Sequence, residues 1–250
     1  MTPPRLSIVI PAYNEAQNIP ALLVSFRKAF ENHNACDWTE LIIVDNNSKD
    51  DTARVLEGEL HKSDYAFART VFEPSPGYGA AIKTGLRAAR GEFLAWTHAD
   101  LQTDPADVFR AFREAEKNVS DGFIIKGKRV GRPFSQALFS SGMAVIASVI
   151  LRKPLWEINA QPKLFRRRLL ETVLNGPDDF SLDVYLLYRA KQSGYPINSI
   201  DVVFEKRLHG TSKWAFSFSS KVKTTIRTVR YLWALRKTLA VSQLDSTLSK

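Results

Sequence analysis

Short apolar runs alternate with segments of helical spacing along most of this chain. Four runs are rich in β-branched or aromatic residues, which is typical of buried strands: Leu6–Ile10, Glu40–Asp45, Arg69–Phe72 and Phe93–Trp96. The segment that begins at Asn14 carries the spacing of an amphipathic helix. Helices are also expected from Ser48, which begins a run of capping-type residues, and from Gly77, which opens a helix that Gly91 closes. Because a helix between two strands returns the chain to the same edge of a sheet, this alternation predicts an α/β fold with a doubly wound, mostly parallel sheet.

The same alternation continues in the second half of the chain. A helix is expected from Asp104 to about Lys117, a strand over Phe123–Lys128, a helix over Ser181–Ser193 and a last strand over Ile197–Phe204. No internal repeat and no low-complexity linker interrupts the pattern. We therefore expect one folding domain over residues 1–205, followed by a segment of different character.

The composition suits a single core with a basic surface. The 250 residues are 44% hydrophobic and carry a formal charge of +9, so the surface should attract anions. The basic residues are mixed with apolar ones and no nucleic-acid-binding motif is present, so no nucleic-acid partner is expected. Cys36 stands alone, which excludes an intrachain disulfide, and residues 1–6 lack the features of a signal peptide. Both observations favour the cytoplasm.

Residues 133–151 are free of charge and lie between Arg132 and Arg152. Their length approaches the ~20 residues that a membrane span needs. However, serine and glutamine dilute the first half, and the apolar part from Met143 to Leu151 is too short to span alone. We expect a helix that packs against protein or lies at a membrane surface.

Residues 206–240 contain many lysines and arginines, no acidic residue, and interleaved aromatic and aliphatic side chains. This pattern predicts basic amphipathic helices at an anionic membrane surface. The alternatives are a solvated face packed on its own core and a dimer contact. Residues 241–250 are expected to form a disordered tail.

A polar cluster follows the strand Phe93–Trp96 and contains His98, Asp100, Gln102 and Asp104. Groups at the carboxyl end of a strand lie where open α/β sheets bind their substrates. Carboxylate and amide oxygens suit Mg²⁺ or Mn²⁺ bound to a diphosphate. The cluster therefore indicates a divalent metal cofactor and chemistry on a nucleotide diphosphate.

Five motifs occur in a fixed order along the chain: Ile8–Glu15, Ile42–Thr52, Gly77–Ala81, Gly91–Ala95 and Ala99–Gln102. Together they resemble the family 2 glycosyltransferases, and the resemblance covers about residues 6–215. Ala99–Gln102, Tyr188–Tyr195 and Arg207–Lys213 are most similar to the polyprenyl-phosphate glycosyltransferases of the dolichyl-phosphate mannose synthase type. The resemblance implies the nucleotide-sugar-binding GT-A fold for residues 1–205.

The resemblance also implies a donor site. Its residues would be Pro11, Ala12, Tyr13, Glu15, Asp45, Asn46, Gly79, Lys83 and Ala99. Asp45 would accept hydrogen bonds from the base, although it would equally suit a turn or helix cap. Gly77 and Gly79 would let the backbone approach the donor, with Lys83 at a phosphate. The alternative is an ordinary glycine-capped helix with a surface lysine. Asp45-Asn-Asn-Ser departs from the usual Asp-Asp-Gly-Ser, which bears on base or ribose recognition.

The metal site implied by the resemblance contains an unusual residue. Asp100 matches the second Asp of the family's Asp-x-Asp motif, and Gln102 matches a further ligand. His98 stands where the first Asp is expected. Histidine ligates Mn²⁺ but is a poorer ligand for Mg²⁺. His98 would therefore shift the metal preference, weaken the metal or serve the sugar, or it is a structural histidine at the strand end.

Phosphate-binding residues are implied in two places. Arg129 and Arg132, with Ser135, match the acceptor-phosphate-binding part of the polyprenyl enzymes. Arg207 and Lys213 match a loop that closes over the donor and acceptor phosphates. Arginine forks suit phosphate, and the alternative for all four basic residues is a general basic surface.

Asp183 matches a polar position near the reaction centre of related enzymes. It would act as a base, orient the sugar or cap its helix. A phosphate acceptor is already ionised and needs positioning more than proton removal. Gln161 and Lys163 lie where this chain departs from its relatives, and they would touch sugar or phosphate.

These observations predict an inverting glycosyltransferase that moves a sugar from a nucleotide-sugar donor to a polyprenyl-phosphate lipid acceptor. The enzyme would lie at the cytoplasmic face of an anionic membrane surface, alone or with a membrane-protein partner. Two other functions remain open at this point. One is transfer to a soluble glycan or protein acceptor, and the other is a degenerate member that binds nucleotide without catalysis.

Overall fold

The structure is a computed structural model that describes residues 3–118, 120, 122–131, 134–205 and 225–237. Contacts divide the chain into two compact units. Unit 1 comprises Met1–Gly131 and Asn159–Gly210, and unit 2 comprises Arg132–Ile158 and Thr211–Lys250.

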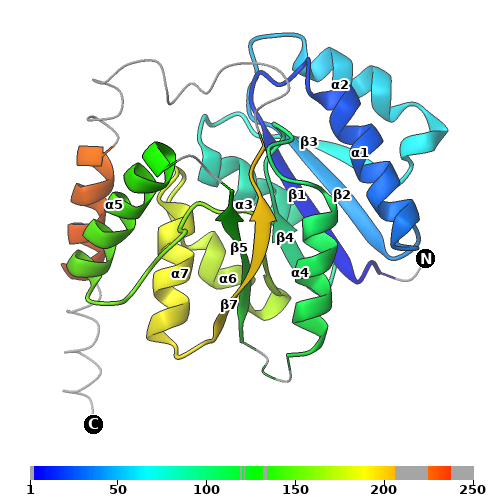
Figure 1. The fold of residues 1–250 in the computed structure, drawn as a ribbon. Coiled ribbons are helices and arrows are strands. Elements are labelled where there is room, and N and C mark those ends of the chain that lie inside the picture. Colours follow the sequence, from blue (N-terminus) through cyan, green and yellow to red (C-terminus); the bar gives the residue numbers. More distant parts are fainter. Residues whose placement is uncertain (1–2, 119, 121, 132–133, 206–224, 238–250) are drawn as a thin grey trace. The chain divides into compact units, whose positions relative to one another are not determined.

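Unit 1 is built on a seven-stranded sheet with the strand order β3-β2-β1-β4-β6-β5-β7 (Figure 1). The strands are β1 (Leu6–Ala12), β2 (Thr39–Asp45), β3 (Ala68–Phe72), β4 (Phe93–Trp96), β5 (Ile124–Val130), β6 (Lys163–Arg166) and β7 (Ile197–Val203). All neighbouring strands are parallel except β6, which runs antiparallel to both β4 and β5. The predicted doubly wound, mostly parallel sheet is therefore confirmed, and β6 is an addition that the sequence pattern did not predict.

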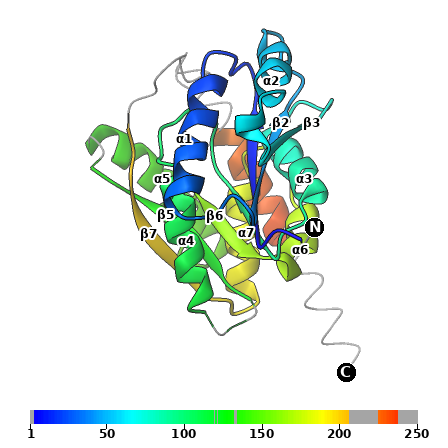
Figure 2. The ribbon, with the colours of Figure 1, turned by 90° about the vertical axis from the view of Figure 1, so that its right-hand side faces the viewer.

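Helices cover both faces of this sheet. They are α1 (Ile19–Asn32), α2 (Thr52–Leu60), α3 (Tyr78–Ala88), α4 (Ala106–Glu116), α6 (Leu170–Leu174) and α7 (Leu182–Gln192), with the 3₁₀ turns η1 (Ser63–Tyr65) and η2 (Arg167–Leu169). Figure 2 shows α1 and α4 over one face, with α3 and α6 on the other. The alternation of side chains along β1 fits this layering, because Ile8 and Ile10 join the core under α1 and α4 while Val9 faces α3 at Gly85.

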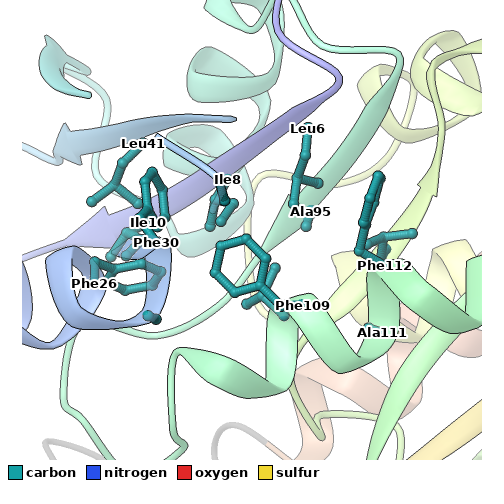
Figure 3. Close-up of a cluster of buried hydrophobic side chains, with 14 of the residues drawn as sticks. Leu6, Ile8, Ile10, Phe26, Phe30, Leu41, Ala95, Phe109, Ala111 and Phe112 are labelled. Carbon is teal, nitrogen blue, oxygen red and sulfur yellow. The ribbon is translucent and has the colours of Figure 1, made fainter. Parts of the chain in front are cut away.

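Aromatic side chains fill the core between the sheet and helices α1 and α4 (Figure 3). Phe30 and Phe109 meet edge to face, with ring centroids 5.5 Å apart, and both side chains are fully or almost fully buried. Burying one such side chain contributes about 1.5–3 kcal/mol. This packing fixes the helices against the sheet and so fixes the strand ends that form the candidate site.

Unit 2 contains α5 (Phe134–Leu151) and a helical segment at 225–237. Within this unit the Arg236 guanidinium donates a hydrogen bond to the backbone oxygen of Ile150 (3.1 Å). Among the described residues, none of the helices combines the length and apolar content that crossing a membrane requires. Residues 206–224 and 238–250 lie outside the described residues, so the predictions of basic helices over 206–240 and of a disordered tail stay predictions.

Candidate active site

The carboxyl ends of three parallel strands, β1, β2 and β4, meet at one edge of the sheet (Figure 1). The register pairs Ala12 with Asp45, and residues 98–100 follow the end of β4 at Trp96. Tyr13 follows β1 directly and leaves 42% of its surface exposed. The structure therefore brings the predicted donor-binding residues from three strand ends to the same edge.

Hydrogen bonds tie the loop after β1 to the loop after β2. The backbone N–H of Asn14 donates to Ser48 Oγ (3.0 Å), and that of Glu15 donates to Thr52 Oγ1 (2.9 Å). The carboxylate of Asp45 accepts the Ser48 N–H at Oδ1 (3.1 Å), so it does cap the turn after β2. One oxygen of a carboxylate can cap a turn while the other meets a ligand, so this bond is compatible with the role predicted for Asp45.

The side chain of Asn46 organises the loop that leads into α3. Its Nδ2 donates to the carbonyl oxygens of Ser75 (2.7 Å) and Glu73 (3.3 Å), and its Oδ1 accepts the N–H of Gly77 (2.9 Å). This loop connects β3 to α3, so Asn46 acts on the donor edge through backbone geometry.

The glycines at the start of α3 make room for another part of the chain. A Cβ on Gly77 or Gly79 would lie 2.3 Å from a carbonyl oxygen of residues 177–178. Lys83 Nζ lies 2.6 Å from Asp178 Oδ1 and also donates to the carbonyl oxygen of residue 176 (2.7 Å). The glycines and the lysine thus hold the α6–α7 loop, which explains these residue types without a phosphate. Contact between Lys83 and a phosphate stays a prediction.

The loop after β4 is folded around Asp100. Asp100 is buried, and its Oδ1 accepts the N–H of Gln102 (3.2 Å) across Leu101, which has a positive φ of 56°. Gln102 Nε2 donates to the backbone carbonyl oxygen of Glu205 (3.1 Å). The backbone N–H of Glu205 donates in turn to the backbone carbonyl oxygen of Gln102 (2.9 Å). The loop that holds the predicted metal ligand is therefore joined to Glu205, which lies two residues after the end of β7 and two before Arg207 in the sequence.

His98 lies beside this loop, with its ring centroid 6.0 Å from that of Tyr78. Burial lowers the pKa of His98, although the carboxylates of Asp100 and Asp183 act in the opposite direction. The positive charges of Lys163 and Arg129 lower the pKa further. The imidazole is therefore neutral at pH 7 and offers one donor and one acceptor.

A buried polar cluster stands next to His98 and links β6 to α7 and α3. Gln161 Nε2 donates to the Tyr78 hydroxyl (2.9 Å) and to Asp183 Oδ1 (3.2 Å). Lys163 Nζ lies 3.0 Å from Asp183 Oδ1 and also donates to a backbone oxygen, while Phe180 stacks on Tyr78 with ring centroids 4.7 Å apart. Burial raises the pKa of Tyr78, and the negative charge of Asp183 adds to this effect, so the phenol stays protonated.

Sequence reasoning singled out Asp183, Gln161 and Lys163 but missed Tyr78 and Phe180. The only signal for Tyr78 was an aromatic residue between two glycines at a helix start. Phe180 lies directly before the helix of Asp183, and nothing in its local pattern distinguishes it from a core residue.

Arg129 is the one predicted acceptor-phosphate residue whose side chain lies among the described residues. It stands near the end of β5, and its guanidinium carbon lies 5.5 Å from the centroid of the Phe204 ring. Arg132, Arg207 and Lys213 lie outside the described residues, and Ser135 belongs to the first turn of α5, where side chains are not described. The roles implied for these four residues stay predictions.

The described residues contain no cluster of three histidine, cysteine or acidic side chains that would hold a metal by protein groups alone. The Asp100 site still fits a divalent cation. Mg²⁺ is commonly held by one or two carboxylates together with substrate phosphates and waters, and a single buried carboxylate at a strand end supplies that protein share.

Residues 7–180 match the family described as glycosyl transferase family 2. The match covers most of unit 1. The chain belongs to glycosyl transferase family 2. The predicted class of enzyme, a glycosyltransferase, is confirmed.

Curated relatives extend over nearly the whole chain. An uncharacterized glycosyltransferase of Mycobacterium tuberculosis is 28% identical over 226 residues, which cover 87% of this chain and 93% of the relative. A dolichyl-phosphate beta-glucosyltransferase of Dictyostelium discoideum is 26% identical over 248 residues, which cover 92% of this chain and 75% of the relative.

A solved structure of glucosyl-3-phosphoglycerate synthase from Mycobacterium tuberculosis has the same fold. It contains Mn²⁺, uridine diphosphate and glucosyl-3-phosphoglycerate, and it superposes with a TM-score of 0.68 at 18% identity. The superposition covers 93% of this chain and 80% of the other. The predicted GT-A fold is thereby confirmed, while the predicted basic helices after residue 205 are not tested by this likeness.

Proposed function

We propose that this protein transfers a sugar, with inversion, from a nucleotide diphosphate sugar to a polyprenyl phosphate. The observation that carries the proposal is the pair of hydrogen bonds between the Asp100 loop and Glu205. These bonds join the predicted donor and metal loop to the segment after β7, which precedes Arg207 in the sequence. A site that holds the departing diphosphate and an incoming phosphate needs these two segments together.

The donor would lie along the edge formed by β1, β2 and β4, with its base near Asp45. Asp100 would hold Mg²⁺ or Mn²⁺, with help from Gln102 and His98. Glucosyl-3-phosphoglycerate synthase structures contain Mn²⁺ or Mg²⁺ together with uridine diphosphate, which supports a divalent cofactor. When bound, the metal would offset the negative charge that develops on the leaving diphosphate.

The acceptor phosphate would be held by Arg129 together with Arg132, Arg207 and Lys213. A phosphate oxygen is already ionised, so attack on the anomeric carbon requires alignment and no proton removal. The environment of Asp183 agrees with this chemistry. Its Oδ1 accepts hydrogen bonds from Lys163 and Gln161, so this oxygen is already engaged by protein donors. Asp183 would therefore orient groups in the site and would not act as a base.

The relative from Dictyostelium discoideum supports a lipid phosphate as the acceptor, since its name states a dolichyl-phosphate substrate. A second candidate is a soluble phosphorylated acceptor. It is favoured by the solved relatives, which include complexes with phosphoglyceric acid and UDP-glucose. Both candidates share the chemistry of a phosphorylated acceptor held by basic side chains.

Unit 2 supports a lipid acceptor through the side chains that it exposes. Ten large hydrophobic side chains are exposed in the described part of the chain, and six of them belong to this small unit: Val145, Ile146, Val149, Trp156, Ile226 and Trp233. The helical segment 225–237 also contains Arg227, Arg230, Arg236 and Lys237. Exposed aliphatic and tryptophan side chains with basic neighbours suit the interface of an anionic membrane. We infer peripheral attachment through unit 2.

The test is transfer from UDP-glucose or GDP-mannose, with Mn²⁺ or Mg²⁺, to three acceptors offered separately in detergent. The acceptors are undecaprenyl phosphate, dolichyl phosphate and 3-phosphoglycerate, with products identified by mass spectrometry. We expect a glycosylated lipid phosphate, lost in Asp100→Ala and retained in Glu57→Ala, which removes an exposed carboxylate on α2. Product from 3-phosphoglycerate alone would favour the soluble acceptor, and no product from any pair would contradict the proposal.

A further inference from the structure

Gln161 occupies the centre of the buried cluster beside the candidate site. Only 1% of its surface is exposed. Its amide nitrogen, Nε2, donates to the Tyr78 hydroxyl at 2.9 Å and to Asp183, whose two carboxylate oxygens lie 3.2 and 3.5 Å away. Both hydrogens of the amide group are therefore directed at the protein itself.

The orientation of this amide is fixed by charge. An ionised carboxylate only accepts hydrogen bonds, and Asp183 is paired with Lys163, whose Nζ lies 3.0 Å from Oδ1. The two side chains are 0% and 2% exposed, so neither charge is screened by solvent. Turning the Gln161 amide by 180° would place its oxygen against the Asp183 oxygens. Lys163 and Asp183 thus act as positioning residues that determine which end of Gln161 faces away from them.

The oxygen at that other end, Gln161 Oε1, is buried and has no hydrogen-bond partner among the described residues. Leaving such a group unsatisfied is unfavourable, so a folded protein that retains one requires an explanation. The same amide group donates through Nε2 to the Tyr78 hydroxyl, and the centroid of the Tyr78 ring lies 6.0 Å from that of His98, next to the Asp100 loop. The amide group that carries the unpaired oxygen therefore adjoins the candidate site.

We propose that Gln161 is a sugar-recognising residue and that Oε1 accepts a hydrogen bond from one hydroxyl of the sugar carried by the donor. The inference rests on the proposed function, because it assumes a nucleotide-sugar donor at the Asp100 edge. A sugar hydroxyl supplies the required hydrogen. Diphosphate oxygens carry no hydrogen at neutral pH, and the base is expected at Asp45, on a strand two positions away from β4.

The proposal predicts a defined pattern of selectivity. A site built to bond a substrate hydroxyl discriminates against an analogue that lacks it, because a buried polar group is then left unpaired. We expect one monodeoxy donor to bind at least about tenfold more weakly than its parent. Donors that lack one of the other hydroxyls should lose less affinity, since their missing groups do not face Gln161.

The experiment measures donor binding by the full-length protein with Mn²⁺, in the absence of any acceptor. UDP-glucose and GDP-mannose are compared by calorimetry, and the four monodeoxy forms of the tighter one, at C2, C3, C4 or C6, are then titrated. The same series is measured with Gln161→Met, which keeps the length of the side chain and removes both polar atoms. We expect this variant to bind the parent sugar about tenfold more weakly and the sensitive deoxy analogue with unchanged affinity.

Gln192→Met is the matched control. Gln192 also donates its Nε2 to a tyrosine hydroxyl, that of Tyr188 at 3.1 Å, but it lies at the far end of α7 from Asp183. Its substitution should leave the whole series unchanged. If Gln161→Met fails to fold, Tyr78→Phe removes one of the two partners of the amide. This variant should reduce the difference in affinity between the parent donor and the same monodeoxy analogue.

Three outcomes would overturn the inference. An equal loss of affinity for every donor would indicate a structural role, and an unchanged series would indicate that only an ordered water satisfies Oε1. A wild-type protein that binds nucleotide sugars without discriminating among deoxy forms would contradict it as well. Failure of the proposed function has a different signature, since the wild type would then bind neither UDP-glucose nor GDP-mannose.

Discussion

Lys163 Nζ lies 3.0 Å from Asp183 Oδ1, and the two side chains are 0% and 2% exposed. An ion pair this deeply buried contributes little net stability, but removing one partner leaves an uncompensated charge. We expect Lys163→Met to lower the free energy of unfolding by about 3–5 kcal/mol. The double variant Lys163→Met/Asp183→Leu should lose clearly less free energy of unfolding, because no unpaired charge remains buried.

Denaturation with urea measures both variants. The exposed pair Lys128–Asp201, at 3.3 Å, provides the control, and Lys128→Met should change the free energy of unfolding by less than about 1 kcal/mol. A double variant that is less stable than Lys163→Met would refute this account of the pair.

Glu40 connects three strands at the opposite edge of the sheet, and its pKa gives stability a defined pH dependence. Burial alone would raise this pKa, but the Ser7 hydroxyl (2.6 Å) and the Arg90 N–H (2.7 Å) donate to the carboxylate, and the charges of Arg69 and Arg90 act in the same direction. The net effect lowers the pKa of Glu40 below its usual value.

Because the folded state binds this proton less tightly than the unfolded state, Glu40 stabilises the fold above the unfolded pKa of about 4.3. That contribution is lost as the pH falls through the lower, folded pKa. Glu40→Gln should therefore cost about 1–3 kcal/mol at pH 7, and the difference from wild type should shrink towards pH 3. Urea titrations of both proteins at several pH values measure this difference in the free energy of unfolding. A difference that grows on acidification would contradict the prediction.

Gly79 is required by the chain that packs on it. A Cβ there would lie 2.3 Å from the Pro177 oxygen and 2.8 Å from the Asp178 carbonyl carbon. Gly79→Ala should therefore destabilise the protein by about 1–3 kcal/mol. Gly58, within α2, has nothing within 4 Å of its own added Cβ. Gly58→Ala should instead stabilise by about 0.5–1 kcal/mol, and melting temperatures that shift in opposite directions would support both assignments.

These residues show where local sequence information ends. The strands β1, β2 and β4 were predictable, because β-branched or aromatic runs that are buried on both faces have few other structures available. Strand β6 was not, since its four residues begin with Lys163, whose charge is compensated by Asp183 on a distant helix. The glycines at the start of α3 were recognised from the sequence, but their neighbour, residues 177–178, is about a hundred positions away.

In the candidate site, too, local patterns predicted the strand ends but not the contacts between distant residues. Strand ends placed Asp45 and Asp100 correctly at one edge, because the topology of a parallel sheet determines that position. The commitment of Asn46 to the loop before α3 depended on tertiary contacts that no local pattern encodes. The stacking of Phe180 on Tyr78 is a further contact of this kind.

Membrane attachment through unit 2 predicts a sharp contrast between exposed hydrophobic residues. Trp233 is 48% exposed on the helical segment 225–237, and Phe72 is 59% exposed at the end of β3 in unit 1. Trp233→Asp should reduce co-sedimentation with phosphatidylglycerol vesicles several-fold, because it removes apolar burial and adds repulsion. Phe72→Asp should leave it nearly unchanged. If the wild type bound neutral and anionic vesicles equally, the electrostatic contribution to membrane attachment would be contradicted.

Asp100 and Asp104 lie in one loop but are expected to differ in their response to metal. Asp100 is buried and predicted to hold the cation, whereas Asp104 is exposed and accepts the Ala106 N–H at the start of α4 (2.9 Å). Saturating UDP at a hundredfold excess over its Kd should stabilise the wild type by about 2.7 kcal/mol. Most of that gain should require Mn²⁺, because the cation bridges the carboxylate and the diphosphate.

Asp100→Asn preserves an oxygen that can accept the Gln102 N–H, so the loop should keep its fold while losing the charge. We expect the Mn²⁺-dependent part of the UDP stabilisation to disappear in Asp100→Asn and to persist in Asp104→Asn. The readout is the melting temperature with UDP in Mn²⁺, Mg²⁺ or EDTA. Including His98→Asp separates the remaining alternatives for that position, since a gain in Mg²⁺ response would mark His98 as a substitute ligand. An unchanged metal response in Asp100→Asn would place the cation elsewhere and remove the basis for the proposed donor site.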